Sequence, residues 1–249
     1  MAASGSQTMT EFCEQVNPKV SLEMRRKRPA FDMLRVQESW LALPEKHALI
    51  WLAKRTPETI GPDDLTILGL TAQLGAGLFY ALSSRNRYAL LGVVACLAVN
   101  WLGDSLDGTL ARVRQRQRPR YGFYVDHMVD SFGALALMGG LAFSGYMHPW
   151  IAIGLLVAFL MLSVQSYLAT HALGEFRISF WRFGPTELRL LLAIGNLALL
   201  WKPMVHVLGR QLRLFDIGGA IGLAGMSLML LVFTGQNTAR LYREERIPQ

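Results

Sequence analysis

Apolar residues in this chain gather in long runs, separated by short polar stretches. A helix needs about 20 mainly apolar residues to cross a bilayer. Six runs approach or reach that length, at 64–82, 88–111, 122–145, 149–172, 185–201 and 216–236. We therefore expect an all-α integral membrane protein, built as a six-transmembrane-helix bundle. The fifth run is short and opens with GPTELR, so we expect it to begin as a polar half-turn.

The segment 31–57 mixes apolar and charged positions and indicates two short amphipathic pieces broken near Pro44. Because a spanning run follows at once, we interpret the segment as an amphipathic membrane-surface helix. A solvated helical pair on a soluble subdomain is the alternative. The expected organisation is a flexible basic tail at 1–30, an amphipathic region at 31–63, the six-helix transmembrane domain at 64–240 and a cytoplasmic tail at 241–249.

Composition and charge support a membrane location. Hydrophobic residues make up 52% of the chain and charged residues 17%, well below the roughly 25% typical of soluble domains. The formal net charge is +7, which together with this hydropathy favours an anionic lipid surface over nucleic acid. Of the 25 Lys and Arg residues, 19 lie in the two terminal segments and in the loops 112–121 and 173–184. The positive-inside rule then places both termini in the cytoplasm.

Four aspartates interrupt the second and third runs near their predicted cytoplasmic ends. Asp104 and Asp107 are spaced i, i+3, while Asp126 and Asp130 are spaced i, i+4, so each pair shares one helix face. The connecting residues 112–121 are few enough for antiparallel packing of the two helices. We expect two pairs of carboxylates that face each other across a cleft.

Four close carboxylates would repel one another, and divalent cations would relieve that repulsion. Carboxylate oxygens suit Mg²⁺ or Mn²⁺, and two such ions can clamp a diphosphate. Two other interpretations remain open. The acids could cap helix ends or solvate a rim, or they could line the ion or proton pathway of a transporter.

The sequence Asp104-x-x-Asp107-Gly108-x-x-Ala111-Arg112, followed by Gly122-x-x-x-Asp126-x-x-x-Asp130, resembles the signature of the CDP-alcohol phosphotransferase family, also called CDP-alcohol phosphatidyltransferases. The resemblance implies that the four aspartates hold two metal ions and that Asp130 is the general base. It also implies that Gly108, Ala111 and Gly122 leave room for the cytidine nucleotide, while Arg112 meets its phosphates. In physical terms, a side chain at Gly108 or Gly122 would fill space between closely packed helices.

Intramembrane prenyltransferases offer a competing resemblance, because they also hold a diphosphate through two aspartate motifs. Asn100-x-x-x-Asp104 and Asp126-x-x-x-Asp130 could be aligned with those motifs. Such enzymes are longer bundles, with more spans than the six expected here. They also do not require the glycines, alanine and arginine of the first signature.

Two stretches bear on the substrates. The element DHMVDS at 126–131 is similar to one in choline and ethanolamine phosphotransferases. RFGPTELR at 182–189 resembles the start of the fifth membrane span in those enzymes. The spacing between Gly184 and Thr186 is shorter here than in the eukaryotic enzymes. We therefore favour a CDP-amino-alcohol donor and diacylglycerol as acceptor. CDP-diacylglycerol with a small alcohol or alcohol phosphate is the alternative.

Several neighbouring residues have two interpretations each. His127 is either a second candidate for the base or an anchor of a helix end. Glu187 is either close to the substrate headgroup or acceptor, or a first-turn acid that favours the helix dipole. Arg189 is either a phosphate ligand or a snorkelling cation. An aromatic cage for a quaternary amine could come from Trp101, Tyr167 and Trp181.

The sequence thus predicts a metal-dependent transferase of phospholipid biosynthesis that releases CMP. A transporter or structural bundle is the alternative of another class. The expected partners are a CDP-linked donor, a lipid and the membrane, with a homodimer as one arrangement and no nucleic acid. The expected location is a bacterial inner membrane, with the active site facing the cytoplasm.

Overall fold

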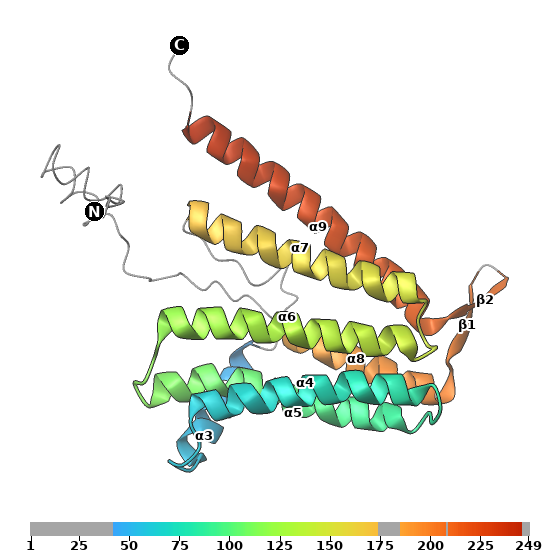
Figure 1. Ribbon diagram of the computed structural model, residues 1–249, viewed down its shortest axis with the longest axis horizontal. Coiled ribbons are helices and arrows are strands. Elements are labelled where there is room, and N and C mark those ends of the chain that lie inside the picture. The colour runs from blue at the N-terminus through green and yellow to red at the C-terminus, as the bar shows by residue number, and fades with distance from the viewer. Residues whose placement is uncertain (1–41, 174–184, 208, 246–249) are drawn as a thin grey trace, which may run out of the picture. The chain divides into compact units, whose positions relative to one another are not determined.

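The structure is a computed structural model that describes residues 42–173, 185–207 and 209–245. Helices dominate this part of the chain, and one short hairpin interrupts them (Figure 1). In chain order the elements are α3 (Ala42–Arg55), α4 (Pro62–Ser83), α5 (Ala89–Val113), α6 (Pro119–Phe143), α7 (Pro149–Leu173), α8 (Pro185–Trp201), β1 (Met204–Val207), β2 (Arg210–Arg213) and α9 (Leu214–Glu244).

Each of the six apolar runs coincides with one helix, from α4 to α9. Four of them, α4, α5, α7 and α9, are long and apolar enough to cross a membrane. Helix α8 has 17 residues, and α6 has 25 but carries Asp126 and Asp130 in its first half. The chain is therefore a multi-pass integral membrane protein. Six as the number of spans remains a prediction.

A two-stranded antiparallel hairpin departs from the all-α expectation. It joins α8 to α9 and pairs Met204 with Arg213 and Val207 with Arg210. Gly209 in the turn has a φ of 75°, a backbone conformation that glycine adopts without strain. The β-branched Val205 and Val207 favour extended backbone. The last helix consequently begins at Leu214 and extends to Glu244, beyond the predicted end at residue 236.

Helix α3 covers the segment predicted to be the second amphipathic piece and begins at Ala42, close to the predicted break. The first piece lies outside the described residues. Leu49 and Ala53 of α3 are buried and form a small core with Leu65, Leu106 and Leu110 of α4 and α5. Helix α3 therefore packs against protein on one side, and its location at a membrane surface remains a prediction.

Helix α4 packs closely against both α5 and α6, which make little direct contact with each other. The short connection indicated antiparallel packing of α5 and α6, whereas in the structure both helices pack mainly on α4. The physical reason is the glycine content of these helices. A Cβ at Gly103 on α5 would lie 2.6 Å from the carbonyl oxygen of Leu65, and a Cβ at Gly140 on α6 would collide with the backbone of Gly77. Both helices approach the α4 backbone closely, so each packs mainly on α4.

A buried polar contact joins α4 to α8 within the main hydrophobic core. The side-chain amide of Asn196 donates to the hydroxyl oxygen of Tyr80 across 2.7 Å, and both residues are fully buried. A buried hydrogen bond of this kind is costly to break, because it leaves an unsatisfied polar group. The contact therefore holds α8 against the α4–α5 pair at a defined position.

Candidate active site

The structure brings the four aspartates together. Asp104 and Asp107 lie in the C-terminal half of α5, and Asp126 and Asp130 lie in the N-terminal half of α6. All four side chains are partly buried. The carboxyl group of Asp130 is close enough to the other three, and to Arg189, to interact with their charges. The two carboxylate pairs thus lie close together, as predicted. The helices that carry them are both packed on α4.

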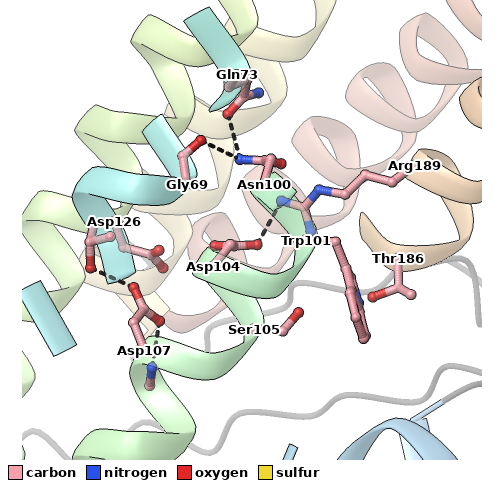
Figure 2. A network of polar contacts seen from close by, with 12 residues as sticks. Gly69, Gln73, Asn100, Trp101, Asp104, Ser105, Asp107, Asp126, Thr186 and Arg189 are labelled. Atoms are coloured by element: carbon pink, nitrogen blue, oxygen red, sulfur yellow. Dashed lines mark hydrogen bonds and ion pairs between the residues drawn. The ribbon is translucent and has the colours of Figure 1, made fainter. Parts of the chain in front are cut away.

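Asp104 forms an ion pair with Arg189 of α8, with 2.6 Å between Oδ2 and Nη2 (Figure 2). The side chains are 28% and 15% exposed, so water screens this pair only in part. Arg189 therefore contributes a positive charge to the aspartate group. Of the two interpretations of Arg189, a cation that snorkels away from the site does not fit this contact.

Asp107 accepts a hydrogen bond from the Thr66 hydroxyl of α4, with 2.6 Å between the oxygens. Its other carboxylate oxygen accepts from the backbone N–H of Gly108. These two donors fix the orientation of the carboxylate. No pattern in the sequence pointed to Thr66, because its proximity to Asp107 depends on how α4 packs on α5.

His127 follows Asp126 on α6, and its Nδ1 lies 3.8 Å from Oδ2 of that aspartate. The imidazole ring also lies against two aromatic rings, with centroid distances of 4.2 Å to Phe123 and 4.7 Å to Tyr167. These contacts hold His127 beside the aspartates, which is compatible with both interpretations given for it.

The proposed aromatic cage is only partly covered by the structure. Tyr167 packs against His127 and Phe123, whereas the indole N–H of Trp101 donates to Glu45 across 2.8 Å. Trp181 lies outside the described residues. The cage therefore remains a prediction, with two of its members engaged in separate local contacts.

Gly108 and Gly122 do not lie between closely packed helices, so that physical expectation is wrong. A Cβ at Gly122 would meet nothing within 4 Å, and one at Gly108 would meet only the end of the Arg112 side chain at 3.6 Å. The tight helix contacts involve other glycines, above all Gly103 and Gly140. Space beside Gly108 and Gly122 is open instead, as a bound ligand would require.

Arg112 is exposed, and its Nη2 donates to the Thr109 hydroxyl across 3.0 Å. Ala111, beside it, is half-buried on α5. Further along the loop, the Arg114 guanidinium donates to the carbonyl oxygens of Thr56, Pro57 and Ile60 at 2.6–2.9 Å. This contact fastens the end of α5 to the linker between α3 and α4.

Thr186 and Glu187 lie in the first turn of α8, just before Arg189. Both are half-buried, and the Thr186 hydroxyl lies within hydrogen-bonding distance of both carboxylate oxygens of Glu45, at 3.0 Å and 3.2 Å. Residues 182–184, which carry the rest of the resemblance in this stretch, lie outside the described residues. Glu45 belongs to α3, and the sequence did not point to it.

Asn100 serves helix packing. It is 3% exposed, and its side-chain amide donates to the carbonyl oxygen of Gly69 at 3.0 Å and to Oε1 of Gln73 at 3.2 Å (Figure 2). Through its amide nitrogen, Asn100 thus joins α5 to α4.

The donor set fits divalent cations in kind. Four carboxylates supply hard oxygen ligands, and they lie within electrostatic range of one another. No group of three or more His, Cys, Asp or Glu side chains is already arranged around one point in the part of the chain that the structure describes. Asp104 and Asp107 instead face Arg189 and Thr66.

Fold and site together define a multi-pass membrane protein with a carboxylate-rich centre between helices. The model of the family described as CDP-alcohol phosphatidyltransferase matches residues 59–233, well over half of the chain. The chain belongs to this family. It is therefore an enzyme that transfers substituted phosphate groups in phospholipid biosynthesis, from a CDP-alcohol to an alcohol, and such enzymes generally depend on a divalent metal.

Proposed function

We propose that the chain transfers a substituted phosphate group from a CDP-amino-alcohol to diacylglycerol and releases CMP. The observation that carries the site assignment is the convergence of four carboxylates from α5 and α6, with Arg189 at Asp104. A diphosphate donor brings negative charge to this centre, so cations must accompany it. Arg189 supplies one positive charge against these four carboxylates.

Asp104, Asp107, Asp126 and Asp130 are the proposed ligands of two Mg²⁺ or Mn²⁺ ions. When bound, these ions would neutralise the donor diphosphate and stabilise the departing CMP oxygen. The contact from Thr66 supports this assignment, because it holds the Asp107 carboxylate in a fixed orientation. Arg112 is proposed to contact the nucleotide phosphates, with room left by Gly108, Ala111 and Gly122.

Asp130 is the proposed general base, and it would accept the proton of the acceptor hydroxyl. Its proximity to the other three aspartates supports a position at the reacting centre. His127 is the second candidate, because its ring lies beside Asp126. The deprotonated hydroxyl oxygen would attack the phosphorus distal to cytidine, and the bond from that phosphorus to the CMP oxygen would break.

The substrate pair rests on the similarity of DHMVDS to choline and ethanolamine phosphotransferases, and Glu187 is proposed to lie near the headgroup or acceptor. A second pair has its own support. Arg189 is a guanidinium inside the aspartate group, and it could bind the phosphate of an alcohol phosphate while CDP-diacylglycerol serves as donor. Family membership favours either reaction over a transporter or a structural bundle.

We further propose that α6 and α8 also span the membrane and that both termini and the aspartates face the cytoplasm of a bacterial inner membrane. Arginine distribution supports this orientation. The Arg114 contacts support it too, since they join the loop after α5 to the linker after α3 on one side of the bundle.

Product analysis tests the proposed reaction. Purified protein in lipid nanodiscs with Mg²⁺ or Mn²⁺ would be given CDP-choline or CDP-ethanolamine with diacylglycerol, and separately CDP-diacylglycerol with serine, glycerol 3-phosphate or inositol phosphate. We expect CMP and a new phospholipid from the first group, seen by mass spectrometry. Product from the second group alone would overturn the substrate assignment, and Asp107→Asn protein serves as the inactive control.

A further inference from the structure

Glu45 occupies an unusual place beside the aspartate centre. Its Oε1 accepts hydrogen bonds from the indole N–H of Trp101 at 2.8 Å and from the Ser105 hydroxyl at 3.1 Å, both on α5. The Thr186 hydroxyl of α8 donates to the same carboxylate, 3.0 Å from Oε1 and 3.2 Å from Oε2. One half-buried side chain of α3 thus joins two other helices.

The residues that contact Glu45 lie next to the residues of the Arg189–Asp104 ion pair on the same two helices. On α5, Asp104 lies between Trp101 and Ser105 in sequence, and on α8, Arg189 comes three residues after Thr186. Residues three or four apart share a helix face. The same two faces therefore meet twice, once through the Glu45 carboxylate and once through the bond between Arg189 and Asp104.

Charge strengthens this arrangement. Hydrogen bonds to a carboxylate are stronger than those between neutral groups. The N-terminus of α8, at Pro185, also favours a nearby negative charge. No Lys or Arg forms an ion pair with Glu45 among the residues that the structure describes. Its three donors are neutral side chains of α5 and α8, so they are what holds this carboxylate in place.

We propose that Glu45 is a positioning residue of the transferase. Its carboxylate fixes the start of α8 against α5 and so holds Arg189 at Asp104. Helix α3 lies before residue 59, where the match to the family begins. The inference thus adds to the catalytic unit a helix outside the matched region. Its positional part is independent of the proposed substrates, and its catalytic part rests on the proposed function.

The positional part is tested by measuring a distance between α5 and α8. Spin labels at Val113 and Leu190, two exposed positions, would report this distance by double electron–electron resonance in protein without Cys13 and Cys96. We expect a narrow distribution in the parent protein and a broadened or shifted one after Glu45→Ala. Thr186→Val, which keeps shape but removes the hydroxyl, should act alike.

Two variants keep this test specific. Glu45→Gln retains an oxygen that can accept two of the three hydrogen bonds, so it should preserve more of the narrow distribution than Glu45→Ala does. Glu58→Ala removes an exposed acid from the nearby linker and should change nothing. Unchanged distances in both Glu45→Ala and Thr186→Val would overturn the proposal, whatever the substrates prove to be.

The catalytic part is tested by a double-mutant cycle that measures CMP release. Glu45→Ala should lower kcat by about tenfold to a hundredfold, as expected for lost hydrogen bonds to a charged group. In an Arg189→Ala background the same change should have little further effect on kcat, because the ion pair through which Glu45 is proposed to act is already absent. Fully additive losses would overturn the link to Arg189. A rise in KM for the CDP-linked donor with unchanged kcat would also overturn it, by indicating direct substrate contact.

Discussion

Arg189 on α8 and Asp104 on α5 are joined by an ion pair of 2.6 Å in the centre of the candidate site. The guanidinium lies where a cation bound by the aspartates would feel its charge. Like charges repel even when partly screened, so Arg189 should weaken binding of a divalent ion while it orients Asp104.

Removal of the Arg189 charge should therefore tighten metal binding. We expect Arg189→Gln to increase Mn²⁺ affinity by about tenfold and to lower turnover, since an orienting and phosphate-binding group is lost. Arg189→Lys keeps the charge and should bind Mn²⁺ much as the parent does. Electron paramagnetic resonance of free Mn²⁺ measures the affinity without substrate. Weaker binding in Arg189→Gln would contradict the assignment.

Thr66 should matter through the Asp107 carboxylate that it orients. Loss of such a supporting contact typically costs about 10–100-fold in metal affinity or activity, and we expect a loss of that size for Thr66→Val. Asp107→Asn removes the ligand charge itself and should nearly abolish turnover. Thr71 on the same helix is exposed and donates to the carbonyl oxygen of Ile67, so Thr71→Val is the matched control. Near-normal turnover in Asp107→Asn would end the two-metal proposal.

The identity of the base can be decided by two variants measured in two assays. Loss of a general base lowers the rate by about 10²–10⁴-fold. If Asp130 is the base, Asp130→Asn should show this loss in CMP release while CDP affinity in Mg²⁺ falls less. His127→Ala would show that pattern if the imidazole accepts the proton. Should both variants release CMP at the normal rate, the acceptor is activated elsewhere, and Glu187 is the next residue to test.

A methyl group added to a glycine of α6 should destabilise the protein only where that glycine contacts α4. Gly140→Ala places a Cβ against the backbone of Gly77, so we expect a loss of about 1–3 kcal/mol in the free energy of unfolding. At neighbouring Gly139 a Cβ meets nothing within 4 Å. Gly139→Ala should be neutral or slightly stabilising, because alanine favours helix more than glycine. Thermal unfolding in detergent compares the two directly.

Topology can be tested at the loop between α5 and α6. Gln115 is exposed there, and the arginine bias places it in the cytoplasm. A cysteine at position 115, in protein without Cys13 and Cys96, should react with an impermeant maleimide only after the cells are opened. Labelling in intact cells would reverse the orientation. A cysteine at Arg210 in the hairpin, on the opposite side, should show the reverse pattern.

The aspartate group could be predicted from sequence because it depends on local helical spacing and on a match at fixed positions. The residues that surround it could not. Thr66 reaches Asp107 because α4 packs on α5, and Glu45 reaches Thr186 because α3 packs beside α5 and α8. No spacing along the chain indicates that packing. Arg189 was recognised as a candidate, but its partner was not.

The glycines show the same limit. Gly108 and Gly122 stood out because the signature contains them, and they were assigned a packing role that the structure gives to Gly103 and Gly140. An isolated glycine in an apolar run does not reveal which neighbour it will face. Similarly, the hairpin at Met204–Arg213 was too short to stand out against the flanking apolar helices.

Because α4 meets both α5 and α6 backbone against backbone, the main chains that carry the two aspartate pairs are held at a fixed distance from each other. Rotation of an aspartate side chain can move its carboxylate. The distance between the α5 and α6 backbones, however, can change only if a helix shifts. Substrates of different headgroup would thus share one rigid frame at the reacting phosphates. Changes in substrate preference should arise farther out, where side chains such as those at the start of α8 can be exchanged without moving that frame.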